Sequence, residues 1–207
     1  MKKIMDKLIN NVKFDKKYVF FMLVIVILGI ITGSLFVIIL NSADKLLIKE
    51  YIEDFINTIN TDYKTNLYNN IMLNYSSVIL ISVIGFTYFL FPLNILILFY
   101  KSFVIGFSVS SFIMCYSIKG LLLSIIYIFP HHILNILFLG FLTAFTAKLS
   151  IKMINHIIRK KSVDLRAYFN KYICILLLIS ILYIFTTLYE TYIIPRLLIF
   201  LLRILNI

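Results

Sequence analysis

Long apolar runs, separated by short polar segments, make up most of the chain. The first run, residues 18–40, has 23 residues without a charge. An α-helix rises about 1.5 Å per residue, so this run is long enough to cross a hydrocarbon core of about 30 Å. Similar apolar regions follow at residues 71–116, 121–147 and 172–189. The pattern predicts an all-α, polytopic integral membrane protein.

Two of these regions contain interruptions. Residues 71–116 are too long for one span, and Pro92 in the segment Phe91-Pro92-Leu93-Asn94 predicts a tight turn between two spans. Pro130 predicts a break within the fourth span. The apolar part of the tail, residues 197–205, is too short to span. The predicted spans are residues 18–40, 71–91, 95–116, 121–147 and 172–189.

Charges gather between the spans and predict their orientation. Residues 1–17 form a basic amphipathic tail with six Lys against two Asp, and residues 148–171 carry seven basic residues against one Asp. Segment 41–70 is acidic, with three Lys against five Asp and Glu. Lys and Arg concentrate in cytoplasmic loops. We therefore expect a cytoplasmic amino terminus, a cytoplasmic 148–171 loop and an outer carboxyl terminus, all in one membrane domain over residues 18–207.

The composition agrees with this assignment. The chain is 62% hydrophobic and 14% charged, with a mean hydropathy of +1.01. That leaves too little polar surface for a water-soluble globule. The net charge of +11 reflects an excess of Lys and Arg. In a membrane protein these residues usually mark the cytoplasmic side. We expect contact with membrane lipids and no nucleic-acid partner.

The outer segment 41–70 has the periodicity of an amphipathic helix. Ser42 is the expected N-cap, and Asp44 falls in the first turn. The apolar face, which must meet lipid, the rest of the chain or another protein, is predicted from Leu47, Tyr51, Phe55 and Ile59, with Ile48, Ile52 and Ile56 alongside. The acidic residues of this helix include Glu50, Glu53 and Asp54.

No pattern in the sequence indicates catalysis. The spans contain no paired carboxylates, no Gly-x-Ser-Gly turn and no glycine-rich phosphate loop. His131 and His132 are adjacent, so on a helix they point about 100° apart, and a zinc site requires three or four ligands. We expect a protein that is not an enzyme, with no cofactor and no metal.

Polar residues inside spans are costly and are therefore functional candidates. Pro130 and His131 either line a cavity or bind a partner, or they form a packed kink with bonded histidines. Lys101 either extends to the cytoplasmic interface or lies on a pathway. Glu190 and Tyr192, near the outer end of the last span, either anchor a partner or belong to an interfacial belt. Gly106 predicts close helix packing.

Three blocks of residues, in order, resemble a known family. The first is Tyr100-Lys101-Ser102-Phe103-Val104-Ile105-Gly106-Phe107-Ser108. The second is Lys119-Gly120-Leu121-Leu122-Leu123, followed by Ile128-Phe129-Pro130-His131. The third is Glu190-Thr191-Tyr192-Ile193-Ile194-Pro195-Arg196-Leu197-Leu198. Together they resemble the stage II sporulation protein M family, whose members also have a basic amino-terminal tail and five spans.

The resemblance implies a role in endospore formation. Proteins of this family lie in the sporulation septum and the engulfing membrane, where they act with stage II sporulation proteins D and P, which remodel peptidoglycan. The family member is a multi-pass anchor that does not itself cut the wall. We expect the helix bearing Glu50, Glu53 and Asp54, and the end from Glu190 to Pro195, to recruit that partner. Whether the chain forms a homo-oligomer stays open.

Two other functions remain open from the residues. A small transporter or channel subunit would use the polar break at Pro130, His131 and His132, because transporters build sites at broken spans. The chain has no evident inverted repeat, yet an odd number of spans does not exclude a transporting oligomer. The other function is a passive assembly factor without a lytic partner.

Overall fold

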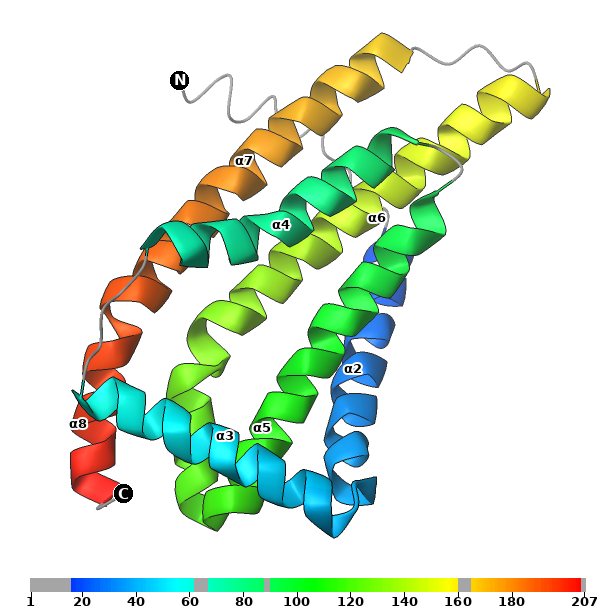
Figure 1. Cartoon of the computed structure of the whole chain (residues 1–207). Coiled ribbons are helices and arrows are strands. Elements are labelled where there is room, and N and C mark those ends of the chain that lie inside the picture. Colours follow the sequence, from blue (N-terminus) through cyan, green and yellow to red (C-terminus); the bar gives the residue numbers. More distant parts are fainter. Residues whose placement is uncertain (1–15, 62–66, 88–89, 160–164, 206–207) are drawn as a thin grey trace.

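The computed structural model describes residues 16–61, 67–87, 90–159 and 165–205. These residues are helical almost throughout and contain no strand, so the all-α prediction is confirmed. The predicted tail, residues 1–17, lies almost entirely outside the described part. The helices in Figure 1 are α2 (Lys16–Ile39), α3 (Ser42–Thr61), α4 (Leu67–Phe86), α5 (Phe91–Tyr127), α6 (Phe129–Arg159), α7 (Leu165–Tyr192) and α8 (Ile194–Leu205).

Four helical stretches of the described chain are long and apolar enough to cross a membrane. They are Lys17–Ile39, Phe91–Tyr127, Phe129–Ile158 and Phe169–Leu205. The apolar stretch of α4, Ile71–Gly85, is shorter and covers only about 22 Å along its axis. The five-span count and the orientation of the termini therefore stay predictions.

The helices form a bundle with one amphipathic helix at its end. Helices α2, α5, α6 and α7 run along one another, and α4 lies obliquely across α6 and α7 (Figure 1). Helix α3 crosses the bottom of the bundle in this view, against α5 and α8. Pro92 occupies a first-turn position of α5, where its missing N–H costs no helical hydrogen bond. The turn predicted near Pro92 therefore separates α4 from α5.

Helix α5 reverses direction at Ser117, a reversal that no proline marks. Ser117 has φ 51° and ψ −126°, a conformation that glycine adopts far more readily than a residue with a Cβ. Three residues later, a Cβ on Gly120 would lie 1.8 Å from the carbonyl oxygen of Phe112. The chain can therefore fold back on itself here only because residue 120 lacks a side chain.

The break predicted at Pro130 is confirmed as an interruption at Ile128. Helix α5 ends at Tyr127, and α6 begins at Phe129 with Pro130 in its first turn. The amide of Ile128 donates to the carbonyl of Ser124 at 2.8 Å, and the amide of His132 donates to that of Ile128 at 3.2 Å. The chain therefore bends at this point without losing its helical bonds completely.

Replacing Ser117 by glycine should stabilise the protein. Ser117→Gly removes a Cβ from a strained backbone conformation, so we expect the free energy of unfolding to rise by about 1 kcal/mol. The melting temperature in detergent, followed by circular dichroism, should rise by about 2–4 °C. Ser110→Gly, in the regular part of the same helix, should lower it. An unchanged or lower melting temperature for Ser117→Gly would contradict this assignment.

Helices α2 and α5 pack with their backbones in direct contact. A Cβ on Gly106 would lie 2.0 Å from the carbonyl oxygen of Ile30, and one on Gly33 would lie 2.1 Å from that of Phe103. The hydroxyl of Ser34 donates to the carbonyl of Gly106 at 3.2 Å. Small residues permit this approach in a membrane, where packing drives helix association. The close packing predicted at Gly106 is confirmed.

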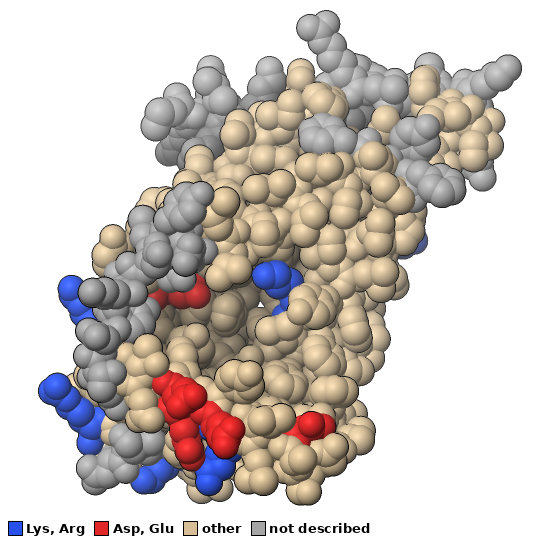
Figure 2. All heavy atoms as spheres, viewed as in Figure 1, with Lys and Arg blue, Asp and Glu red and all other residues tan. Residues whose placement is uncertain are grey.

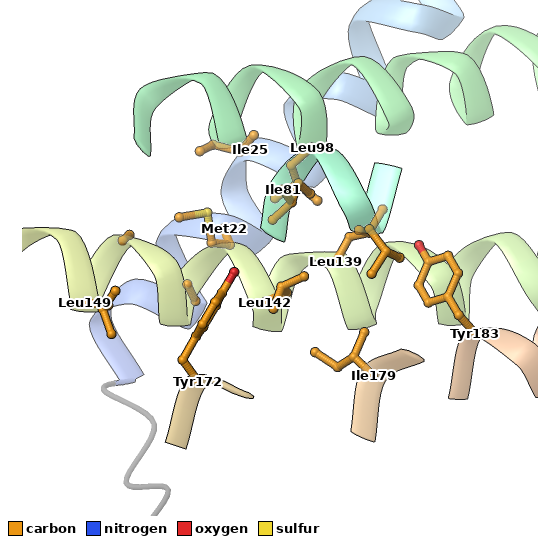
Figure 3. Packing of buried hydrophobic residues seen from close by; sticks show 13 residues of the cluster. Met22, Ile25, Ile81, Leu98, Leu139, Leu142, Leu149, Tyr172, Ile179 and Tyr183 are labelled. Carbon is orange, nitrogen blue, oxygen red and sulfur yellow. The ribbon is translucent and has the colours of Figure 1, made fainter. Parts of the chain in front are cut away.

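The main hydrophobic cluster surrounds α6. Figure 3 shows Leu139, Leu142 and Leu149 along this helix, with side chains of α2, α4, α5 and α7 directed toward it. Tyr172 and Tyr183 of α7 are 0% and 1% exposed. Because α6 lies inside the bundle, more of its residues are buried than in the other long helices. Its buried polar residues are His131, Asn135, Thr143, Thr146 and Ser150.

A second cluster joins α3 to α5 and α8. The buried stripe of α3 comprises Ile52, Ile56 and Ile59, so its apolar face meets the rest of the chain. Leu47 and Tyr51, predicted to belong to this face, are instead 53% and 75% exposed. Ile52, Ile56 and Ile59 are spaced by four and three residues and therefore lie on one side of the helix. Leu47 and Tyr51 lie on another side.

Two local expectations around the polar segments are corrected. The N-cap of α3 is Asn41, whose Oδ1 accepts the amide of Asp44 at 2.8 Å, in place of Ser42. The basic segment predicted as a loop over 148–171 is largely helical, since α6 continues to Arg159 and α7 begins at Leu165. The charged residues after residue 147 end the apolar run in the sequence, but they do not end helix α6.

Candidate functional site: a polar cavity within the bundle

A cavity of about 80 Å³ lies between α4, α5, α6 and α7. Its polar lining residues are Asn74, Ser77, Lys101, Ser108, His132, Asn135 and Tyr183. Figure 2 shows a hollow on this face of the molecule, with basic and acidic side chains on opposite sides of it. A polar cavity among apolar helices is costly in a membrane, which makes this the candidate site.

Lys101 brings a cationic side chain into the lining. It lies ten residues after the start of α5 at Phe91 and sixteen before the reversal at Ser117, which places it about 15 Å and 24 Å from these ends. The ammonium group has no hydrogen bond or ion pair within the described residues, and it interacts electrostatically with Glu190. Lys101 therefore lies on the cavity at an intermediate depth.

Glu190 joins α7 to α4 and α6 beside the cavity. Asn74 Nδ2 donates to Glu190 Oε2 at 2.6 Å, and Glu190 Oε1 lies 3.8 Å from His131 Nε2. The second distance is too long for a hydrogen bond. His131 is 1% exposed, and neither ring nitrogen has a hydrogen-bond partner among the described residues. His132, whose ring centroid lies 4.1 Å from that of His131, is the histidine that lines the cavity.

Asn135 is held in position by α7. Its Oδ1 accepts the hydroxyl of Thr186 at 2.6 Å, and its carbonyl accepts the hydroxyl of Tyr183 at 3.0 Å. These bonds orient the amide, whose nitrogen has no partner within the described residues. Asn135 and Tyr183 both line the cavity. The α6–α7 wall therefore presents a fixed donor.

The structure brings some predicted site residues together and separates others. Lys101 lines the cavity, and His131 and Glu190 lie together beside it, with Pro130 at the bend next to His131. Glu190 faces the bundle interior, with its side chain 19% exposed, and Pro195 is buried. Tyr192 is 51% exposed. In the part of the chain described, no three His, Cys, Asp or Glu side chains could hold a metal ion.

Helix α3 presents a separate exposed face. Glu50 and Asp54 are exposed, and Glu53 is half-buried with Oε1 3.7 Å from Lys49 Nζ. Leu47 and Tyr51 lie among these carboxylates at helical spacing and are exposed. We call Leu47, Glu50, Tyr51 and Asp54 the α3 face. It combines apolar and acidic groups on the side away from the bundle.

Several lining residues were not predicted from the sequence. Asn74, Ser77 and Tyr183 contribute to the cavity, yet each stands in an apolar run where packing roles are as common as functional ones. Asn74 reaches Glu190 across 116 positions in the chain. Its polar amide within an apolar run was the only local signal. Nothing in the sequence pairs it with Glu190.

The fold and the cavity define an all-α, polytopic membrane protein with charged groups gathered inside its bundle. Residues 21–195 match the family model described as Stage II sporulation protein M, and the chain belongs to this family. It is therefore a sporulation-related membrane protein. No curated protein and no solved structure was found to match it significantly.

Proposed function

We propose that the protein is a non-enzymatic membrane scaffold of the engulfment machinery. In this role it lies in the sporulation septum and the engulfing membrane and recruits peptidoglycan-remodelling enzymes, stage II sporulation proteins P and D. Family membership over residues 21–195 supports the link to sporulation. The recruiting role is supported by the α3 face. This face is exposed, while the opposite side of the helix is buried.

The α3 face has the chemistry of a docking surface. Tyr51, 75% exposed, and Leu47 supply apolar contact, and Glu50 and Asp54 flank them with negative charge. Aromatic anchors surrounded by charges are common at protein interfaces, where charge sets orientation and association rate. If α3 lies outside the cell, as the charge distribution predicts, a partner with a basic surface meets this face.

A scaffold of this kind acts without chemistry of its own. Holding a lytic enzyme at the septum raises its effective concentration over the wall to be remodelled. Because α3 packs on α5 and α8 through Ile52, Ile56 and Ile59, the face keeps a fixed position relative to the membrane. The partner is then held at a defined height. Self-association of the chain would multiply such sites.

Reversing the charges of α3 tests the proposal. The triple variant Glu50→Lys, Glu53→Lys, Asp54→Lys should lose co-purification of stage II sporulation proteins P and D, because like charges then face the basic partner. Membrane insertion should be unchanged, since the buried stripe of α3 is intact. As a matched control, Arg196→Glu with Arg203→Glu alters exposed charges on α8 and should leave recruitment intact. Retained recruitment in the triple variant would place the docking site elsewhere.

The cavity favours a second candidate function, a small transporter or channel subunit. Lys101 and His132 line a polar cavity between helices, beside the bend at Ile128. Solute flux in vesicles containing the purified protein, lost on His132→Ala, would favour transport. Co-purification of the enzymes without any flux would favour the scaffold.

A further inference from the structure

Several groups of the cavity lining can donate hydrogen bonds to a ligand. The ammonium of Lys101, the amide nitrogen of Asn135 and the hydroxyl of Ser108 line it without a hydrogen-bond partner in the described residues. The nearby carboxylate of Glu190 is not part of the lining and accepts a bond from Asn74. A cluster of donors with one cation and no lining carboxylate matches an anion.

The size of the cavity restricts the anion. A volume of about 80 Å³ holds roughly five to eight water-sized groups. A phosphate group, with one phosphorus and four oxygens, fits this space, whereas a nucleotide or a sugar chain does not. The lining donors come from α5 and α6, so they reach different oxygens of one group.

The opening of the cavity indicates where such a group comes from. The hollow in Figure 2 lies between α3 and α4 on the side of the bundle, and the long helices run in the plane of that view. A ligand enters across the helix axes, from the direction that lipid occupies around a spanning bundle. Exposed apolar side chains of α4, among them Ile79, Leu80 and Val83, lie along this helix and suit acyl chains.

We propose that the cavity binds the phosphate group of a membrane lipid whose acyl chains remain in the bilayer. Lys101 neutralises the phosphate charge, and Asn135 and Ser108 donate to its oxygens. Together they replace the water that the phosphate loses on leaving the headgroup region. The bonds from Thr186 and Tyr183 hold Asn135 ready for this contact. The cavity lies apart from the α3 face. The lipid-binding proposal can therefore fail while the scaffold proposal holds, and the reverse is also true.

Lipid binding by the purified full-length chain tests this proposal. Native mass spectrometry should detect phosphatidylglycerol bound to the wild type, and Lys101→Met should weaken that binding about tenfold, because one charge-assisted contact is lost. Ser108→Met, which fills the cavity and keeps the charge, should weaken it similarly and carries the test if Lys101→Met fails to fold. Lys17→Met removes an exposed lysine from α2 and should bind as the wild type does.

Two further probes separate the sources of the anion. Diacylglycerol with the same acyl chains should not displace phosphatidylglycerol, since it lacks the phosphate. Inorganic phosphate at millimolar concentration should not displace it either, since it lacks the acyl chains. Equal binding by Lys101→Met, by Ser108→Met or by diacylglycerol would overturn the proposal. Displacement by inorganic phosphate would show that the cavity binds a soluble anion, and it would overturn the lipid proposal as well.

Discussion

Gly106→Ala should separate α2 from α5 and destabilise the protein. The added Cβ would lie 2.0 Å from the carbonyl oxygen of Ile30, and this neighbour is backbone, which cannot rotate away. Overpacking of this kind costs about 1–3 kcal/mol or more, and here a whole helix must move. The higher helix propensity of alanine offsets up to about 1 kcal/mol of this cost. We expect a net loss of about 2 kcal/mol and a melting temperature lower by roughly 4–8 °C.

Gly140 provides the matched control for this prediction. It is also a helical glycine, on α6, but a Cβ there meets no atom within 4 Å. Gly140→Ala should therefore gain helix propensity without a clash and raise the melting temperature slightly. Circular dichroism of the two purified variants in one detergent measures both effects. Shifts of the same sign would show that close α2–α5 packing does not decide the stability of the bundle.

Tyr172→Ala should have a comparably large effect, through loss of packing. Tyr172 is fully buried, its ring stacks on Phe145 with centroids 6.2 Å apart, and its hydroxyl donates to the carbonyl of Ser82 at 3.0 Å. It thus joins α7 to α6 and α4. Removing a buried aromatic ring costs about 3–5 kcal/mol. We expect the melting temperature to fall by about 10 °C.

Two variants divide the contribution of Tyr172 into its parts. Tyr172→Phe keeps the ring and loses only the hydrogen bond, which is expected to cost about 1 kcal/mol. Phe185→Ala removes a ring of the same helix that is 65% exposed and should have little effect on packing. If Phe185→Ala lowered the melting temperature as much as Tyr172→Ala, ring size would matter and burial would not.

The fold class follows from features that are local in the sequence. An uncharged run such as residues 18–40 leaves its backbone polar groups no partner in lipid except those within its own helix. Pro92 and Pro130 lack an amide N–H, so breaks close to them could be predicted. Charge did not limit helices in the same way: Lys148 and Lys152 ended the predicted fourth span, yet α6 continues to Arg159.

Features that depend on distant residues could not be predicted. The reversal at Ser117 needs a positive φ that serine rarely adopts, and the surrounding packing sets it. The side of α3 that is buried depends on α5 and α8, so the exposure of Leu47 and Tyr51 was not evident from periodicity. The cavity arises where four helices meet. Its members are polar residues that, taken singly, resemble ordinary packing residues.

The proposed role in engulfment is tested most directly by membrane-dye microscopy of sporulating cells with and without the gene. We expect cells without it to form a septum that fails to curve and migrate around the smaller compartment. Restoring the wild-type gene should restore migration, and the α3 triple variant should not. Normal engulfment in the absence of the gene would contradict the scaffold function.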